Sequence, residues 1–140
     1  MGDIGKVEMI LLETAAKALH KAYVLWGFEV GAAVLGEDGK IYEGCNVESW
    51  ISGLGICAER CAINHAILHG NKRIKEIALV MKKASVDPKP CGACLQYISD
   101  FTDDSKIKIV TAKVKNGKIL FETVKVKTLK ELLPHPFKNR

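Results

Sequence analysis

Two cysteines separated by two residues, Cys91 and Cys94, follow Pro90 in the stretch KPCGAC. This spacing is typical of a redox-active dithiol, of half a structural zinc site and of part of a catalytic metal centre, so the pair alone does not distinguish among them. A third cysteine, Cys57, stands upstream in the stretch CAER, which also contains Glu59. The chemistry of the pair therefore depends on whether the fold brings this upstream stretch to it.

Three thiolates with one open position are a suitable donor set for a catalytic zinc ion. Structural zinc sites close with a fourth protein ligand, whereas catalytic sites keep one position for water. Cys57 and Cys91 both stand at the start of a predicted helix, and a helix N-terminus favours the thiolate form that binds metal. Zinc with three thiolates carries a net negative charge, so we expect a cation, Arg60, to donate hydrogen bonds to the sulfurs.

Hydrophobic periodicity predicts the elements that must position these residues. Helical patterns cover residues 7–23, 57–69, 92–101 and 128–133, and strand-like runs cover 30–35, 40–47, 74–81, 107–114 and 119–126. Residues 49–55, with two glycines, are predicted to form a loop. The order of these elements predicts an α/β protein with a mixed sheet covered by helices, and the length fits a single domain over residues 1–140.

Composition and charge point away from membrane and disulfide-rich classes. The chain has 140 residues, 48% hydrophobic and 26% charged, with no membrane-length apolar run and no signal pattern at its beginning. Its five cysteines are an odd number, which argues against a disulfide scaffold and for a reducing, cytoplasmic compartment. The net charge of +5 comes from widely spread lysines without interleaved aromatic residues, so we expect solvated faces and no nucleic-acid or membrane partner.

The cysteine motifs resemble a known family. A Cys or His ligand, one residue, Glu and then Pro-Cys-x-x-Cys is the signature of zinc-dependent nucleobase deaminases, and here it is Cys57-Ala58-Glu59 with PCGAC at 90–94. The chain is similar in particular to the small homotetrameric cytidine deaminases of pyrimidine salvage. The likeness extends from about residue 8 to about residue 137 and includes FEVGAA at 28–33, GCNVE at 44–48 and ELLP at 131–134.

The resemblance implies a fold, a cofactor and a reaction. The fold is a three-layer αβα sandwich with a mixed, roughly five-stranded sheet. One Zn²⁺ per subunit is held by Cys57, Cys91 and Cys94, and the enzyme hydrolyses cytidine and deoxycytidine to uridine and deoxyuridine plus ammonia. Glu59 is implied to be the acid/base group, which takes a proton from the zinc-activated water and delivers it to the pyrimidine.

The resemblance also implies how the nucleoside is bound. Asn46 and Glu48 match positions that hydrogen-bond the ribose 3′-hydroxyl, and Phe28 matches an aromatic residue that packs against the base. Ala58 belongs to the same expected substrate-binding set. Phe137 matches a terminal aromatic residue that reaches the pocket of a neighbouring subunit, so the resemblance implies a homotetramer.

The chain departs from the family pattern around the sugar and beside the metal. Trp50 and Ser52 stand where the family has a small residue and a tyrosine, and Leu95 replaces an arginine after the second cysteine of the pair. These changes leave open a deaminase of a modified cytosine nucleoside, of the blasticidin type, although Asn46 and Glu48 favour a ribose ligand. A zinc-bearing nucleic-acid-binding module is a third, non-enzymatic alternative.

Four potential ligands also repeat every four residues along one predicted helix: Cys57, Cys61, His65 and His69. Residues at this spacing share one face of a helix, but the face drifts by about 40° per step. The segment is otherwise apolar. The spacing therefore favours ordinary packing over a second metal site, which it leaves open.

Overall fold

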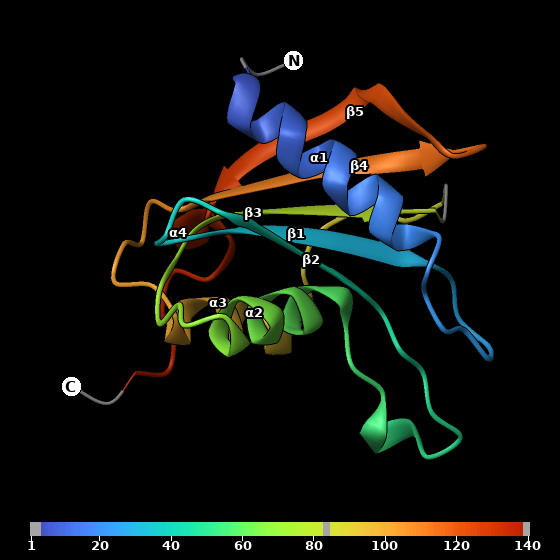
Figure 1. Cartoon of the computed structure of the whole chain (residues 1–140), viewed down its shortest axis with the longest axis horizontal. Helices are drawn as coiled ribbons and strands as arrows, with labels where there is room; N and C mark the ends of the chain where they lie inside the picture. Colours follow the sequence, from blue (N-terminus) through green and yellow to red (C-terminus); the bar gives the residue numbers. More distant parts are fainter. Residues whose placement is uncertain (1–3, 83–84, 139–140) are drawn as a thin grey trace.

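Five strands form a single mixed sheet in the part of the chain that the computed structural model describes, residues 4–82 and 85–138 (Figure 1). The strands are β1 (Val30–Gly36), β2 (Ile41–Cys45), β3 (Ile74–Met81), β4 (Lys108–Lys115) and β5 (Lys118–Thr128). Their order across the sheet is β2-β1-β3-β4-β5, and only β3 and β4 are parallel. The predicted mixed, five-stranded sheet is confirmed.

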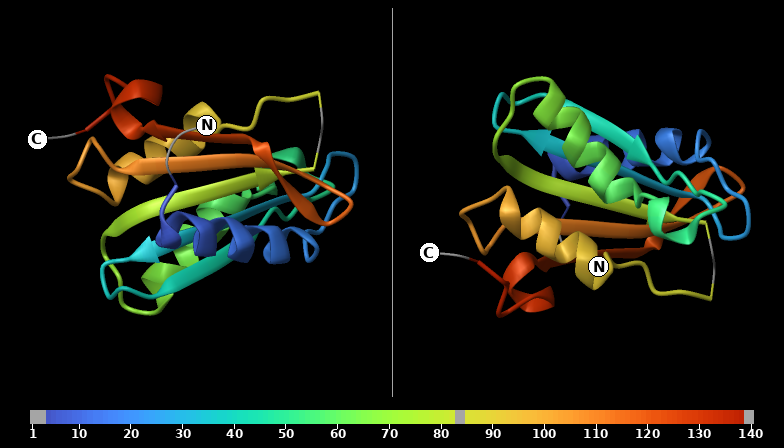
Figure 2. Two further views of the ribbon diagram at one scale, coloured as in Figure 1. Left: turned by 90° about the horizontal axis from the view of Figure 1, so that it is seen from above. Right: turned by 90° about the horizontal axis from the view of Figure 1, so that it is seen from below.

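Helices cover both faces of the sheet and complete three layers (Figures 1 and 2). Helix α1 (Lys6–Leu19) lies on one face, and α2 (Ala58–Leu68) and α3 (Gly92–Asp100) lie side by side on the other. The short α4 (Leu129–Leu132) follows β5, and a 3₁₀ turn, η1 (Ser52–Leu54), lies in the long connection between β2 and α2. The predicted three-layer αβα architecture is confirmed.

The central strand β3 separates two hydrophobic cores because its side chains alternate between the faces of the sheet. Ile77 and Leu79 point into the core beneath α2 and α3, which includes Ile63 and Ile98. Ala78 and Val80 belong to the core beneath α1, which is lined by leucines and alanines of that helix. Since β3 is buried on both faces, its sequence is a continuous apolar run with few polar positions, as predicted.

Two glycines bring the helices unusually close to the sheet. A Cβ atom on Gly31 of β1 would lie 2.0 Å from the carbonyl oxygen of Ala15 in α1, and one on Gly44 of β2 would lie 2.3 Å from the amide nitrogen of Ala62 in α2. Only glycine permits backbone contacts this close. The small residues in these two motifs therefore set the spacing of the layers around β1 and β2.

Element boundaries differ from the prediction where the chain changes partner. Helix α1 ends at Leu19 rather than at residue 23, because Tyr23 instead exchanges backbone hydrogen bonds with Asn46 and Glu48. Strand β2 ends at Cys45, and Val47 pairs with Ile56 across the following connection. Residues 49–55, predicted as a loop, contain η1. The hydrophobic patterns in the sequence indicated the right element types, but they contained no information about these pairings between distant residues.

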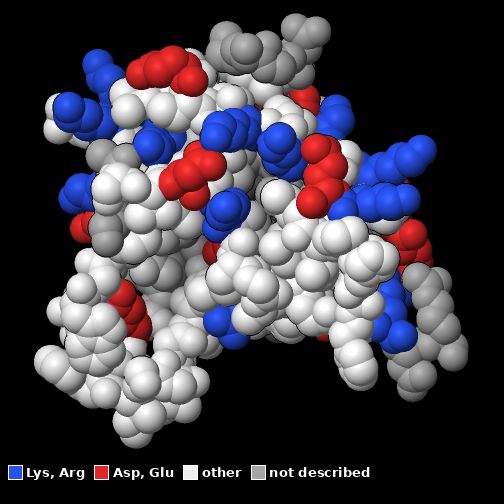
Figure 3. All heavy atoms as spheres, turned by 180° about the vertical axis from the view of Figure 1, so that it is seen from behind, with Lys and Arg blue, Asp and Glu red and all other residues white. Residues whose placement is uncertain are grey.

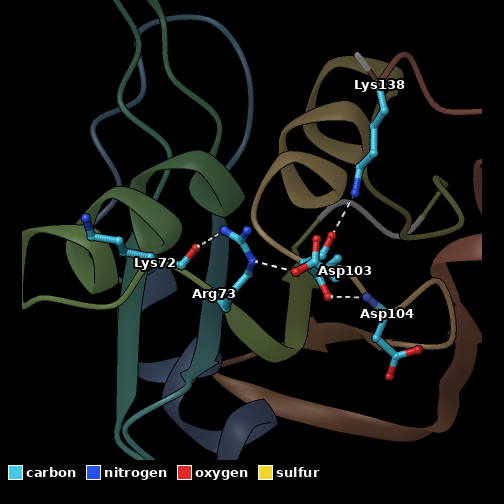
Figure 4. Close-up of polar contacts among 6 residues, drawn as sticks. Lys72, Arg73, Asp103, Asp104 and Lys138 are labelled. Carbon is cyan, nitrogen blue, oxygen red and sulfur yellow. Dashed lines mark hydrogen bonds and ion pairs between the residues drawn. The ribbon is translucent and has the colours of Figure 1, made fainter. Parts of the chain in front are cut away.

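Polar contacts fasten the turn after α3 and the C-terminal segment (Figure 4). Arg73, at the entrance to β3, forms an ion pair with Asp103 (Nε–Oδ2, 3.0 Å), and Lys138 Nζ donates to the carbonyl oxygen of Thr102 at 2.8 Å. Gln96 of α3 contacts the backbone of Phe137 twice, donating to its carbonyl oxygen at 2.6 Å and accepting from its amide at 2.9 Å. The C-terminal segment is thereby held against α3.

Within residues 4–82 and 85–138, no helix combines the length and apolar character needed to cross a membrane.

Candidate active site and metal centre

Two helix N-termini bring three cysteines together. Cys57 is the N-cap residue of α2, Cys91 is the N-cap residue of α3, and Cys94 lies in the first turn of α3. Their Sγ atoms all lie within 4.8 Å of one another. Within the described ranges, this is the one group of three or more His, Cys, Asp or Glu side chains whose ligand atoms converge. The two motifs, CAER at 57–60 and KPCGAC at 89–94, are far apart in the sequence and thus form one cluster in the fold.

The donor set fits zinc. Three sulfurs bound to one zinc ion at about 2.3 Å would lie about 3.8 Å apart, so only small movements separate the observed cluster from a bound geometry. A hydrogen bond from the Cys94 thiol, together with Arg60, lowers the pKa of Cys57 to about 5, and the same hydrogen bond and burial raise the pKa of Cys94. Cys57 is therefore the sulfur most easily deprotonated, and a metal bound by all three sulfurs would require the remaining thiols to release their protons.

Arg60 lies against the sulfurs, as its sequence position suggested. Its Nη2 donates to Cys57 Sγ at 3.4 Å. Its Nε is buried and has no hydrogen-bond partner among the described residues. The guanidinium thus places positive charge beside the thiolates, where it offsets part of the negative charge of a zinc centre with three of them.

Glu59 is a buried carboxyl group beside this cluster. It is the second residue of α2 and only 3% exposed. Burial raises its pKa to about 7, and the negative charge of Cys57 adds to this effect, while contacts with its own backbone and with Cys94 oppose it. A carboxyl group in this state can both accept and donate a proton near neutral pH.

A pocket of about 450 Å³ opens over the cluster, large enough for a nucleoside. It lies where β1 begins, where β2 and β3 end, and where α2 and α3 begin. The predicted site residues that line it are Phe28, Asn46, Glu48, Cys57, Ala58, Glu59, Arg60 and Cys91. Cys94 is fully buried behind them. Phe137 lies elsewhere, on the C-terminal segment beside α3.

Asn46 and Glu48 organise the wall of the pocket through backbone contacts. Asn46 Oδ1 accepts from the amide of Val30 at 2.8 Å, and its Nδ2 donates to the carbonyl oxygen of Phe28 at 2.9 Å. The Glu48 carboxylate accepts four contacts from the amides of residues 25–27, at 2.5 to 3.2 Å. These amides lower the pKa of Glu48, so the group is a carboxylate that holds the loop before β1.

Comparison with known proteins assigns a family to this geometry. The family described as the cytidine and deoxycytidylate deaminase zinc-binding region matches residues 7–111. The chain belongs to this deaminase family. The match spans both cysteine motifs and the strands that carry the pocket wall.

Individual relatives cover most of the chain. A cytidine deaminase of Sporosarcina psychrophila is 42% identical over 100 residues, which are 71% of this chain and 72% of that protein. The crystal structure of cytidine deaminase from Burkholderia pseudomallei has a TM-score of 0.80 and 34% identity, covering 92% of this chain and 98% of that one. A blasticidin-S deaminase of Bacillus cereus is 30% identical over 139 residues, covering 94% and 93%.

The departures from the deaminase pattern fall in different environments. Trp50 is 78% exposed and makes an edge-to-face contact with Trp26 (ring centroids 5.4 Å apart), so it stands on the outer surface of the β2–α2 connection. Ser52 lines the pocket, where it leaves room that a tyrosine would fill. Leu95 is buried in the core beneath α2 and α3, so apolar packing replaces the expected cation.

Several pocket residues were not identified from the sequence, Lys89 and Met81 among them, and one predicted residue has a further role. Lys89 lies directly before Pro90 in the second motif and Met81 is the last residue of β3, and both line the pocket. For Lys89, the available signal was a charge beside the cysteine motif. For Met81, it was the position at the end of a buried strand, where ligands commonly bind. Glu48 also holds the loop of residues 25–27, a contact that no local pattern could reveal.

Proposed function

We propose that this chain is a zinc-dependent cytidine deaminase that hydrolyses cytidine and deoxycytidine to uridine and deoxyuridine. The observation that carries the proposal is the buried Glu59 beside the convergent sulfur atoms of Cys57, Cys91 and Cys94, at the base of a pocket of nucleoside size. The family match and two relatives, which cover 71% and 92% of this chain, support the same activity.

The reaction replaces the exocyclic amino group at C4 of the pyrimidine with oxygen from water. When bound, the zinc ion supplies the Lewis acid that makes a water molecule nucleophilic at neutral pH. Glu59 takes a proton from that water and passes it to N3 as the oxygen bonds to C4. A second proton moves from the new C4 hydroxyl to the amino group, the C4–N bond breaks as the C4 carbonyl forms, and ammonia leaves.

The remaining pocket residues orient the nucleoside. We assign Phe28 to packing against the base and Ala58, which is fully buried at the start of α2, to the floor beneath it. Asn46 and Glu48 are assigned to the ribose 3′-hydroxyl. Both side chains already contact the loop before β1: Asn46 donates to Phe28, and Glu48 accepts from residues 25–27. A ribose contact would use the second Nδ2 hydrogen of Asn46 and the less occupied Oε2 of Glu48.

We further propose that the active form is a homotetramer in the cytoplasm, working in pyrimidine salvage. The connection between β2 and α2 projects from the body as an arm with few charges (Figure 3), and exposed apolar residues gather on it and beside it: Tyr23, Trp26, Val47, Trp50, Ile51, Leu54 and Ile56. The side chain of Phe137 is 84% exposed, although its backbone is hydrogen-bonded to Gln96. Apolar groups fixed in solvent are typical of surfaces that a partner covers.

The proposal is tested by measuring ammonia release from cytidine, deoxycytidine, cytosine, CMP and blasticidin S with protein of known zinc content. We expect turnover of cytidine and deoxycytidine. Absence of turnover with every free nucleoside, at one zinc per chain, would contradict it. Steeply salt-dependent nucleic-acid binding without ammonia release would instead support the non-enzymatic alternative.

A second candidate is a deaminase of the blasticidin type. Two observations favour it: the pocket has Ser52 where the family has a tyrosine, and a blasticidin-S deaminase is a full-length relative. Turnover of blasticidin S at a higher kcat/KM than cytidine would establish this candidate.

A further inference from the structure

A second cluster of ring side chains lies on α2, at the opposite end of the helix from the thiolates. His65 and His69 are one turn apart, and Tyr42 of the edge strand β2 packs against both, with ring centroids 5.3 Å from each. Neither histidine belongs to the thiolate group, and neither has a role in the deamination described above. The pair therefore has to be explained separately.

Backbone contacts fix the tautomer of both histidines. Nδ1 of His65 lies 3.0 Å from the carbonyl oxygen of Glu43, and Nδ1 of His69 lies 3.0 Å from the carbonyl oxygen of His65. A carbonyl oxygen can only accept, so each Nδ1 carries the hydrogen. In the neutral imidazoles the lone pair is then on Nε2, and an Nδ1–H held by a backbone carbonyl is the arrangement that orients histidines for metal binding.

The two rings pack edge to face, at a centroid separation that a chelated pair can also have. Their centroids are 4.9 Å apart with an interplanar angle of 72°. An imidazole bound to a metal through Nε2 at about 2.0–2.1 Å has its ring centroid about 3.2 Å from the metal. Two such rings have centroids as far apart as those of His65 and His69 when the angle between the two metal–nitrogen bonds is about 100°. That angle lies between those of octahedral and tetrahedral coordination.

The cluster is rigid on its inner side and open on its outer side. The Tyr42 hydroxyl donates to Asp38 Oδ2 at 2.6 Å, and the buried Asn71 donates to the same oxygen at 3.2 Å, so the tyrosine ring is fixed. His65 is half-buried and His69 is exposed. The outer side of the pair is therefore accessible to solvent, and both rings are oriented by backbone carbonyls.

From this geometry we propose that His65 and His69 bind a transition-metal cation through their Nε2 atoms, with water completing the coordination. Two imidazoles select borderline cations such as Ni²⁺, Cu²⁺ and Zn²⁺ over Mg²⁺ or Ca²⁺. The cation would cross-link the last turn of α2, the helix whose first turn carries Glu59. This second site is distinct from the thiolate centre and independent of the deaminase activity.

The test uses zinc-loaded full-length protein titrated with NiCl₂ in equilibrium dialysis, with nickel and zinc both measured by elemental analysis. We expect one Ni²⁺ per chain in addition to the retained zinc. His65→Gln and His69→Gln should each weaken nickel binding at least 10-fold, since a chelate becomes a single ligand. His135→Gln, which changes an exposed histidine on the C-terminal segment, is the matched control and should bind nickel as the wild type does.

Three outcomes would overturn the proposal. The first is absence of nickel beyond the zinc content, which would leave the rings as a packing cluster. The second is nickel uptake matched by zinc loss, which would place the nickel at the thiolates. The third is nickel binding that is unchanged in His69→Gln, a substitution at an exposed position that leaves the core intact. Zinc content and circular dichroism of each variant verify that it is folded.

Discussion

The two ends of the active-site pocket are built in different ways. At the metal end, Cys57, Glu59 and Cys91 are fixed by the first turns of two helices that pack on the same face of the sheet. At the other end, around Asn46 and Glu48, where we propose that the sugar binds (the sugar end), the wall consists of loop residues. There Glu48 holds residues 25–27 through backbone amides in a region that is largely exposed. One end depends on regular secondary structure and a buried core, and the other on a few long-range polar contacts.

This difference indicates how change is tolerated at each end. Helix caps and core packing leave few alternatives for the three cysteines and for Glu59, the proposed acid/base group, so we expect substitutions there to abolish chemistry. The loop wall can be rearranged while the sheet remains folded, so we expect substitutions there to alter substrate affinity and assembly. Two of the positions at which this chain departs from its family, Trp50 and Ser52, lie on the more variable loop side. Leu95 is an exception because it lies at the metal end.

The largest effect is expected for Glu59→Gln. The amide keeps the volume but cannot shuttle a proton, so kcat with cytidine should fall by roughly 10²–10⁴-fold while zinc content stays at one per chain. Steady-state ammonia release and metal analysis check this. Glu122→Gln, on exposed β5, is the control. Activity within a few-fold of wild type would show that Glu59 does not act in the mechanism. It would also contradict the view that the metal end carries the chemistry.

A smaller, different effect is expected for Glu48→Gln. The amide presents one acceptor oxygen in place of two and loses the charge, so residues 25–27 and the ribose contact should loosen. We expect KM to rise about 10-fold or more with kcat reduced less. Glu43→Gln, an exposed carboxylate on β2, should leave both constants unchanged. A fall in kcat alone would show that the sugar end contributes to chemistry rather than to binding.

Trp50→Ser should affect assembly more than the individual chain. Because Trp50 is 78% exposed, its loss should change the stability of one chain by less than about 0.5 kcal/mol. If a second copy covers the arm, the substitution removes buried apolar surface and should weaken association about 10-fold. Analytical ultracentrifugation over a concentration series measures this. Phe121→Ser, on β5, is the control, and equal effects from both would contradict a role of the arm in assembly.

The smallest effect concerns a pair remote from both ends, Glu8 of α1 and Glu76 of β3. Burial, followed by the hydrogen bond and the charge of Glu8, raises the pKa of Glu76 to about 8, with Lys108 of β4 opposing. The folded state therefore holds a proton that the unfolded state releases near pH 4.5, so this stability is present below pH 4.5 and is lost as pH rises to 8.

The corresponding variant is Glu76→Gln. Between pH 5 and pH 8 the wild type should lose about 1 kcal/mol or more relative to this variant, measured by urea unfolding of zinc-loaded protein. Glu8 does not contribute to this slope, because its pKa is lowered and it is ionised in both states over the window. Parallel pH profiles for the two proteins would contradict the assignment, and turnover at pH 7 should be unaffected.

The metal end could be predicted from the sequence because its signals are local. Two short motifs, each at the start of a periodic apolar segment, identified Cys57, Cys91 and Cys94 as one possible donor set, and the structure brings their sulfurs together. Helix periodicity and the turn at Asn116 and Gly117, where both residues have positive φ, likewise depend on neighbours in the chain. Interactions between neighbouring residues determine these features, so the features can be read from the sequence.

The sugar end could not be predicted to the same depth because its contacts join residues far apart. Nothing near Glu48 indicates that its carboxylate accepts from amides more than twenty positions earlier. Trp50 was expected to alter the sugar pocket, yet it lies on the outer surface against Trp26. Contacts between distant residues depend on how β1 and β2 are placed in the fold, and the hydrophobic periodicity of the sequence does not indicate this placement.

The contact between Gly44 and α2 has a consequence for laboratory evolution. Since backbone meets backbone there, the helix that carries Glu59 and Cys57 is held by a contact without rotatable bonds, and no change of rotamer can absorb an added methyl group. Libraries that seek new nucleoside specificity should therefore leave Gly44 untouched and diversify pocket-lining residues outside the metal centre, such as Ser52 and Met81. Variants from such libraries would inherit the same catalytic apparatus, and selection would act on recognition alone.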